Sequence, residues 1–166
     1  RLATGEQGEI LVRGYSIMKG YYNNQAETTA AIDADGWLHT GDTGLIRPDG
    51  HLRFIGRFKD MLKVGGENVS PAEVEAFLLK MAEVDQVAVV GYPDARLAEI
   101  PVAFIIPVDG TKPDQGTVAA HCKGKIASYK IPRHVLCVGE LPMTPTGKVQ
   151  KHKLRARAIE DLGAPD

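Results

Sequence analysis

Asp42 directly follows Gly41 in the segment GWLHTGD, residues 36–42, whose other residues favour an extended chain. A carboxylate at the end of a strand can accept hydrogen bonds from two neighbouring hydroxyls, such as the 2′,3′-diol of a ribose. Taken alone, the segment more commonly forms a turn in a β-meander, in which the aspartate bonds to nearby backbone. The first candidate for chemistry is therefore a sugar-binding carboxylate, with a plain turn as the alternative.

A second candidate segment, residues 56–69, combines cations with two consecutive glycines. Arg57, Lys59 and Lys63 alternate along one side, which suits an anionic ligand. Gly65 and Gly66 at the tip of a predicted hairpin let a backbone approach another surface or a thin ligand closely. A solvated hairpin with ordinary surface cations explains this segment as well.

The third candidate is Lys148, in the loop LPMTPTGKVQK of residues 141–151. Two prolines, two threonines and a glycine stiffen this loop, and a lysine on a rigid loop can stabilise negative charge that develops on a phosphate or carboxylate. The Gly-Lys pair lacks the spacing of a P-loop, so that assignment is rejected. A surface lysine before an amphipathic helix is the alternative, and the basic run from Lys148 to Arg157 is more often a solvated helix face.

Composition excludes several other classes of function. A formal net charge of -1 over 166 residues, with 43% hydrophobic residues, argues against disorder and against a strongly basic nucleic-acid binder. The five histidines and two cysteines have no metal-ligand spacing, so no metal site is predicted, and a reducing cytoplasm is the expected location. No apolar run approaches the roughly 20 residues that a membrane span needs.

The elements that must position these residues change in character along the chain. Mixed alternation and glycines in residues 8–22 predict twisted strands with a bulge. Asn24, with a glutamate three residues later, predicts a short capped helix over residues 25–32. Asp49-Gly50 between two strand-like runs predicts a hairpin. The first third of the chain is therefore expected to be rich in β-structure.

Helices and strands intermix after residue 60. Ser70 followed by Pro71 predicts a helix start, with apolar positions at 74, 77, 78 and 81. Residues 86–92 and 100–108 are nearly continuous apolar runs, which are typical of buried strands. A second helix with Val118, Cys122 and Ile126, a strand HVLCV, and a last helix carrying Leu154 and Leu162 complete a small α+β unit.

The predicted domain boundary falls at Lys59-Asp60. No Pro- or Ser-rich linker is present there, so a tight hinge at residues 59–60 is expected between domains 1–58 and 61–166.

The order and spacing of four motifs resemble the late core motifs of the adenylate-forming superfamily. They are GWLHTGD, GRFKDMLKVGGENVSPAEVE, SYKIP and PMTPTGK. That superfamily comprises acyl-CoA and aryl-CoA synthetases, peptide-synthetase adenylation domains and beetle luciferases. The resemblance implies a β-rich end of a large N-terminal domain followed by a small, mobile α+β C-terminal domain. It further implies an enzyme that activates a fatty or aromatic carboxylic acid with ATP and transfers the acyl group to CoA.

The resemblance also implies roles for individual residues. Asp42 and Arg57 match the residues that hold the AMP ribose. Lys59 and Asp60 match the hinge about which the C-terminal domain swings between the two half-reactions. Lys148 matches the catalytic lysine that bridges the acyl carboxylate and the α-phosphate.

The face implied for the thioester step is the hairpin that follows the hinge. Lys63 matches a catalytic position there, and Gly65, Gly66 and Glu67 match the channel for the pantetheine arm. The implied cofactors are ATP, CoA and Mg²⁺, with most of the triphosphate and Mg²⁺ site upstream of this segment. The chain alone is accordingly expected to be inactive.

Three alternatives remain at this point. The acceptor could be a carrier protein instead of CoA, or the chain could be a stand-alone binding or regulatory module of the same fold. A nucleic-acid binder that uses the basic tail is disfavoured by the net charge. No nucleic-acid partner and no integral membrane contact are predicted, and an oligomer is left open.

Overall fold

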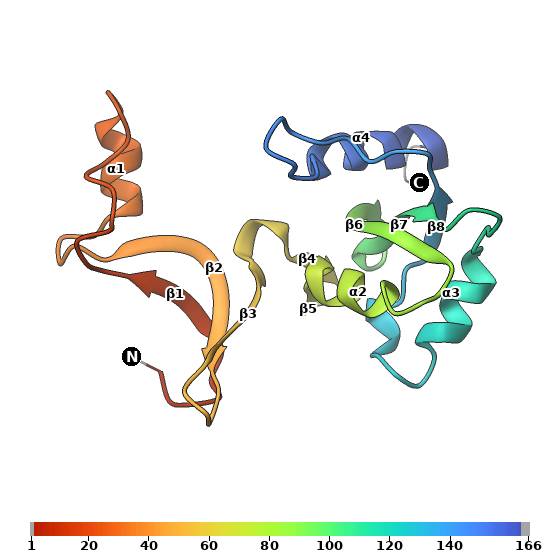
Figure 1. The fold of residues 1–166 in the computed structure, drawn as a ribbon, viewed down its shortest axis with the longest axis horizontal. Helices are drawn as coiled ribbons and strands as arrows, with labels where there is room; N and C mark the ends of the chain where they lie inside the picture. The colour runs from red at the N-terminus through yellow and green to blue at the C-terminus, as the bar shows by residue number, and fades with distance from the viewer. Residues whose placement is uncertain (1, 164–166) are drawn as a thin grey trace. The chain divides into compact units, whose positions relative to one another are not determined.

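A computed structural model describes residues 2–163, which divide between Lys59 and Asp60 into two compact units. The first unit is a three-stranded antiparallel sheet in the order β1-β2-β3 with one helix, and the second is a five-stranded sheet with three helices (Figure 1). This mixed composition confirms the predicted α+β class.

The first unit is built on two long antiparallel pairings. Its elements are β1 (Gly8–Val12), α1 (Gln25–Ala31), β2 (Leu38–Ile46) and β3 (Leu52–Arg57). β2 pairs with β1 on one edge and with β3 on the other, and each ladder contains one register shift. The predicted hairpin at Asp49-Gly50 joins β2 to β3, with Gly50 at φ 82°.

Two predictions for this unit have different outcomes. The capped helix is confirmed to within one residue, because the Asn24 side chain accepts a hydrogen bond from the Glu27 N–H at 3.1 Å. The prediction of strands throughout residues 8–22 is wrong beyond Val12, where the chain forms turns and bends. Gly14 and Gly20 adopt φ values of 156° and 155° there, which breaks the alternation that a strand requires.

The second unit is a sheet covered by helices on both faces. Its elements are β4 (Leu62–Val64), β5 (Glu67–Val69), α2 (Pro71–Leu78), β6 (Val84–Asp94), β7 (Ala98–Pro107), α3 (Gln115–Cys122), β8 (His134–Cys137) and α4 (Lys151–Leu162). The strand order is β5-β4-β7-β6, and β8 pairs in parallel with β7. A short 3₁₀ turn, Phe58–Asp60, precedes β4.

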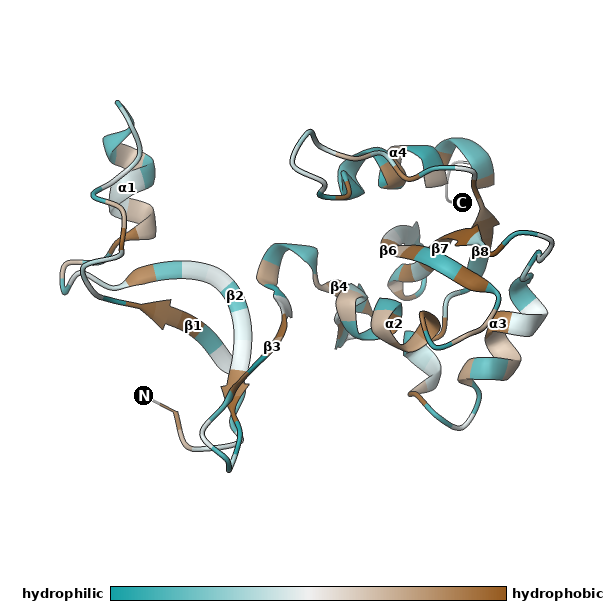
Figure 2. Ribbon diagram, viewed as in Figure 1, coloured by the Kyte–Doolittle hydropathy of each residue, from teal (hydrophilic) through white to brown (hydrophobic). Residues whose placement is uncertain are grey.

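Alternation along the central strands produces two buried clusters. In β7, Ala103 and Ile105 face the cluster that includes α2 and α3, whereas Val102 and Phe104 face the cluster that includes α4. The hydrophobic colouring of β6 and β7 in Figure 2 reflects this double burial. The nearly continuous apolar runs that predicted buried strands are thus confirmed. All members of both clusters lie in the second unit, within the described residues.

Candidate active-site surfaces

Asp42 and Arg57 lie opposite each other on β2 and β3. Arg57 donates from Nε to Oδ1 of Asp42 over 2.7 Å, and both side chains keep substantial exposure, 48% for Arg57 and 28% for Asp42. An exposed pair of this kind contributes only about 0–1 kcal/mol to stability. It leaves acceptor positions on the carboxylate open to solvent, so the pair can receive a diol. The structure therefore brings together the two residues predicted to bind a ribose.

The part of β2 that carries Asp42 is held by side chains from β1 and from β2 itself. Gly41 adopts φ 70°, and its N–H donates to Oε1 of Glu9 over 3.1 Å. The Asp42 N–H donates to the hydroxyl of Thr40, which itself donates to the carbonyl of Ile10 over 2.7 Å. These bonds hold the backbone at Gly41 and Asp42, and the ion pair with Arg57 orients the carboxylate.

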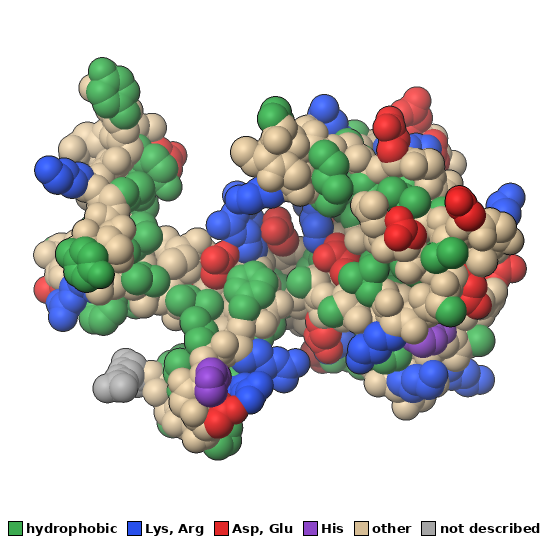
Figure 3. Space-filling view, in the orientation of Figure 1, with side chains coloured by type: hydrophobic (Ala, Val, Ile, Leu, Met, Phe, Trp, Pro, Cys, Tyr) green, Lys and Arg blue, Asp and Glu red, His purple; other side chains and the backbone are tan. Residues whose placement is uncertain are grey.

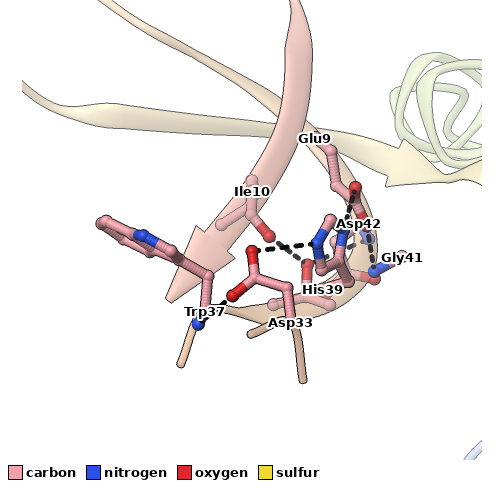
Figure 4. Close-up of polar contacts among 8 residues, drawn as sticks. Glu9, Ile10, Asp33, Trp37, His39, Gly41 and Asp42 are labelled. Carbon is pink, nitrogen blue, oxygen red and sulfur yellow. Dashed lines mark hydrogen bonds and ion pairs between the residues drawn. The ribbon is translucent and has the colours of Figure 1, made fainter. Parts of the chain in front are cut away.

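His39, also on β2, lies between two carboxylates. Its Nδ1 lies 2.9 Å from Oε2 of Glu9 and its Nε2 lies 3.7 Å from Oδ2 of Asp33 (Figure 4). The hydrogen bond to Glu9 is the main reason why the pKa of His39 is raised above its ordinary value of 6.5, although partial desolvation opposes it. Asp33 is fixed in turn by the backbone N–H groups of Asp35 and Trp37. Sequence reasoning assigned His39 no role, because its partner Glu9 lies 30 residues away.

Lys63 and the predicted channel residues form one hairpin. Gly65 and Gly66 have φ values of 59° and 89°, which is the backbone of a two-residue type I′ turn between β4 and β5. The Lys63 ammonium bonds to Oδ1 of Asn68, its cross-strand neighbour, and Glu67 pairs with Val64. The Gly65 N–H donates to the carbonyl of Leu97 over 2.8 Å, so the hairpin is also fixed to the connection between β6 and β7.

Lys148 is on a separate loop that closes on itself. Met143 and Val149 form an isolated bridge, and the N–H of Thr144 donates to the Lys148 carbonyl over 2.8 Å. The Lys148 N–H returns a bond to the Thr144 hydroxyl over 3.0 Å, and Gly147 makes the turn at φ 77°. The Lys148 side chain is exposed, so a fixed backbone presents a cation to solvent.

Lys59 and Asp60 occupy the 3₁₀ turn at the point where the two units divide. The predicted hinge thus lies at the division, and its motion remains a prediction. Within residues 2–163, no three His, Cys, Asp or Glu side chains gather in a way that could hold a metal ion. None of the described helices is long and apolar enough to cross a membrane.

Residues 73–148 match the sequence profile of the AMP-binding enzyme C-terminal domain. This segment belongs to that family. The matched segment begins within α2 and ends at Lys148, and the resemblance drawn from the four motifs is confirmed.

Relatives and solved structures extend the similarity beyond the AMP-binding enzyme C-terminal domain to nearly the whole chain. The putative acyl-CoA synthetase YngI of Bacillus subtilis (strain 168) is 49% identical over 156 residues, which are 94% of this chain and 28% of the relative. ATP-bound MatB of Rhodopseudomonas palustris superposes with a TM-score of 0.88 at 35% identity, over 95% of this chain and 31% of that chain. The amide bond synthetase McbA of Marinactinospora thermotolerans gives 0.87 at 35% identity, over 94% and 32%. The chain thus spans about a third or less of the proteins that it matches.

Proposed function

We propose that this chain is the C-terminal part of an ATP-dependent acyl-CoA synthetase, an AMP-forming acid–thiol ligase. The observation that carries the proposal is the Lys148 loop, a self-closed turn that presents one exposed cation within the matched family segment. The curated relatives named as acyl-CoA synthetases and ligases support CoA as the acceptor. The chain alone is expected to be inactive, because it spans only part of the length of those relatives.

The proposed reaction has two steps. An oxygen of the carboxylate attacks the α-phosphorus of ATP, a phosphorus–oxygen bond to pyrophosphate breaks, and acyl-adenylate forms. The sulfur of CoA then attacks the acyl carbon, the bond to AMP breaks, and the thiol proton is released. The first step brings two anions together, whereas the second needs a narrow passage for a thiol and no cation in its way. One small domain that presents two surfaces in turn meets both needs.

In the first step, Lys148 bridges the acyl carboxylate and the α-phosphate, and its charge stabilises the transition state. Asp42 accepts hydrogen bonds from the ribose hydroxyls, and Arg57 supports the same sugar through the ion pair that it makes with Asp42. Mg²⁺, when bound, would neutralise charge on the triphosphate, and most of the residues that would hold it are expected outside this segment. Each role rests on the match between the motifs and on the exposure of the side chains.

In the second step, the Lys63 hairpin takes the place of Lys148. Gly65 and Gly66 have no side chains, so the pantetheine arm can pass closely over the backbone with Glu67 beside it. Lys59 and Asp60 absorb the dihedral changes of the exchange as the hinge. The proposed compartment is the cytoplasm, which agrees with two cysteines that are not paired with each other.

A carrier-protein acceptor and a non-catalytic binding module are the competing proposals. A protein with a similar C-terminal region is named as an amide bond synthetase, so the acceptor of this chain must be tested directly. A binding module would keep the fold without needing Asp42, Arg57 and Lys148 together. Comparing free CoA with a phosphopantetheinylated carrier protein as acceptors separates the CoA ligase from an enzyme that serves a carrier protein.

The decisive experiment replaces Lys148 in the full-length protein. Lys148→Ala is expected to slow acid-dependent ATP–pyrophosphate exchange by about 10²–10³-fold, while CoA transfer from supplied acyl-adenylate is retained. Lys153→Ala is the matched control, because Lys153 is also exposed and lies on the following helix. Unchanged exchange in Lys148→Ala would refute the role of this lysine. Absence of exchange in the unmodified protein with any carboxylic acid would refute the ligase.

A further inference from the structure

Glu99, near the start of β7, joins two segments that the proposed mechanism uses separately. Its Oε2 accepts the backbone N–H of Lys63 over 2.8 Å, and its Oε1 lies 3.3 Å from Nη2 of Arg155 in α4. The side chain is 25% exposed, so most of the carboxylate is removed from water. One carboxylate therefore bonds to the hairpin strand β4 and to the helix that follows the Lys148 loop.

The Glu99 carboxylate supplies the hydrogen-bond acceptor for the Lys63 N–H, which no backbone carbonyl of β7 supplies. β4 and β7 share a single registered pair, Val64 with Ala98, so the ladder between them is very short. At Lys63 the acceptor is the Glu99 side chain and not a β7 carbonyl. The Glu99 carboxylate thus adds to the ladder with β5 and the Val64–Ala98 pair a contact that fixes the backbone of β4 at Lys63.

The surrounding backbone is arranged to make room for the carboxylate. A Cβ atom on Gly91 would lie 2.4 Å from Oε1 and 2.9 Å from Cδ of Glu99, so no larger residue fits on β6 at this point without displacing it. Ala98, the preceding residue, adopts φ 67°, a left-handed conformation that is unfavourable for a residue with a Cβ. Strain of this kind persists only where neighbouring contacts enforce it.

A second contact fixes the tip of the same hairpin. The carbonyl of Leu97 accepts the Gly65 N–H, and Leu97 Cδ2 would lie 3.1 Å from a Cβ on Gly65. The Asp94 carboxylate accepts the N–H groups of Arg96 and Leu97 over 3.0 and 2.8 Å, which holds the connection from β6 to β7. The segment from Asp94 to Glu99 thus forms a rigid support for β4 and its turn.

We propose that Glu99 is a positioning residue for the thioester step: its carboxylate holds the Lys63 backbone, and with it the Lys63–Gly66 turn, in the orientation that receives the thiol substrate. The inference rests on the proposed ligase function. The Lys148 loop does not depend on Glu99, because it closes through Thr144 and is tied by the Gln150 side chain to the Met143 carbonyl over 2.6 Å. Loss of Glu99 should therefore affect the second half-reaction selectively.

Two substitutions separate the hydrogen bond from the charge. Glu99→Gln keeps an oxygen that can accept the Lys63 N–H, whereas Glu99→Met has a similar length and no such acceptor. Arg155→Met removes the other partner of the carboxylate and leaves the Lys63 bond possible. These three variants are compared with the unmodified full-length protein in both half-reactions.

Glu99→Met is expected to slow CoA transfer from supplied acyl-adenylate by about tenfold or more, with ATP–pyrophosphate exchange changed by less than about threefold. Glu99→Gln and Arg155→Met are expected to stay within about threefold of the unmodified protein in both assays. Equal loss of both half-reactions in Glu99→Met would overturn the proposal, and so would an unchanged transfer rate. Loss of transfer in Arg155→Met would overturn it as well, because Glu99 would then act through α4.

A measurement without catalysis keeps this proposal separate from the ligase proposal. In the 166-residue chain, the Lys63 amide is expected to exchange with deuterium about tenfold faster or more in Glu99→Met than in Glu99→Gln. Val102 and Ile105 in the buried part of β7 serve as internal references that should not change. Equal exchange at Lys63 in the two variants would refute the positioning contact itself. If the Lys63 amide exchanges faster in Glu99→Met as expected, but the full-length protein is inactive, only the proposed ligase function is refuted.

Discussion

The part of β2 around Asp42 shows how a weak motif acquires a defined geometry. Three separate contacts fix it: the ion pair with Arg57, the Thr40 hydroxyl, and the Glu9 carboxylate at the Gly41 N–H. The Glu9 carboxylate also bonds to the His39 ring, so it links His39 to the Gly41 N–H. A change in the charge of His39 therefore acts on the carboxylate that holds Gly41, the residue before Asp42.

Glu9→Gln is expected to lower the pKa of His39 toward 6.5, because the strongest contact that favours the imidazolium is then lost. Since the pKa of His39 in the folded chain is raised, the stabilisation by Glu9 is fully present below pH 6.5 while Glu9 is ionised, and it is lost as the pH rises through the folded-state pKa. Titration of the His39 ring protons by NMR measures the shift. Glu6→Gln, an exposed carboxylate on the same segment, is the control and should leave the His39 titration unchanged.

At the residue scale, local patterns pointed to Asp42, Arg57, Lys63 and Lys148 as candidates, and their roles remain predictions. The structure leaves the side chains of Arg57, Lys63 and Lys148 exposed and that of Asp42 partly exposed. The local patterns missed Glu99 and the Glu9–His39 contact. Glu99 and Lys63 are 36 positions apart in the chain, and Glu9 and His39 are 30 positions apart. No periodicity in the sequence links positions at such separations.

At the scale of elements, the hairpin β4–β5 contacts strand β7 at Ala98, a residue with an unusual backbone conformation. Ala98 has a left-handed backbone at the single pair that joins these strands. Ala98 lies outside the apolar run 100–108 that predicted a strand, and no local pattern in the sequence indicates its left-handed backbone. Tertiary contacts at Val64, Leu97 and Glu99 enforce this conformation.

Ala98→Gly is expected to stabilise the chain by about 0.5 kcal/mol, because relief of roughly 1–2 kcal/mol of left-handed strain exceeds the entropy that glycine gains in the unfolded state. Urea unfolding that reports the free energy of unfolding measures the effect. Ala120→Gly in α3 is the control of opposite sign, with an expected loss of about 1 kcal/mol at an exposed helical position. A loss of stability in both variants would show that the Ala98 conformation is not strained.

At the scale of the whole molecule, the two units differ in how they are stabilised. Both buried clusters belong to the second unit, whereas the strands of the first unit leave many large apolar side chains exposed (Figure 3). The exposed set on these strands and their loops includes Leu11, Val12, Tyr15, Tyr22, Ile46, Leu52 and Phe54. Exposed apolar groups of this number on one sheet are typical of a surface that another segment or partner covers.

We therefore expect the 166-residue chain to bind a hydrophobic dye such as ANS strongly, and a chain of residues 60–166 to bind it weakly. Amide exchange should be fastest in β1–β3 and slowest in β7, which pairs with β4, β6 and β8 and so lies at the centre of the second sheet. Fluorescence titration of the two chains at equal concentration makes the comparison. Equal dye binding by both would place the exposed apolar surface outside the first unit.

The loop of residues 143–150 closes through its own bridge, its own threonine hydroxyl and its own glutamine side chain. Its conformation is therefore encoded almost entirely within eight consecutive residues. Such a segment behaves as a cassette: moved into another member of the family, it should carry its lysine in the same pose without compensating changes nearby. The hairpin that carries Lys63 lacks this independence, because Leu97 and Glu99 would have to be transplanted with it. Recombination between relatives can thus exchange the Lys148 loop by itself. The Lys63 hairpin must be exchanged together with the segment that contains Leu97 and Glu99.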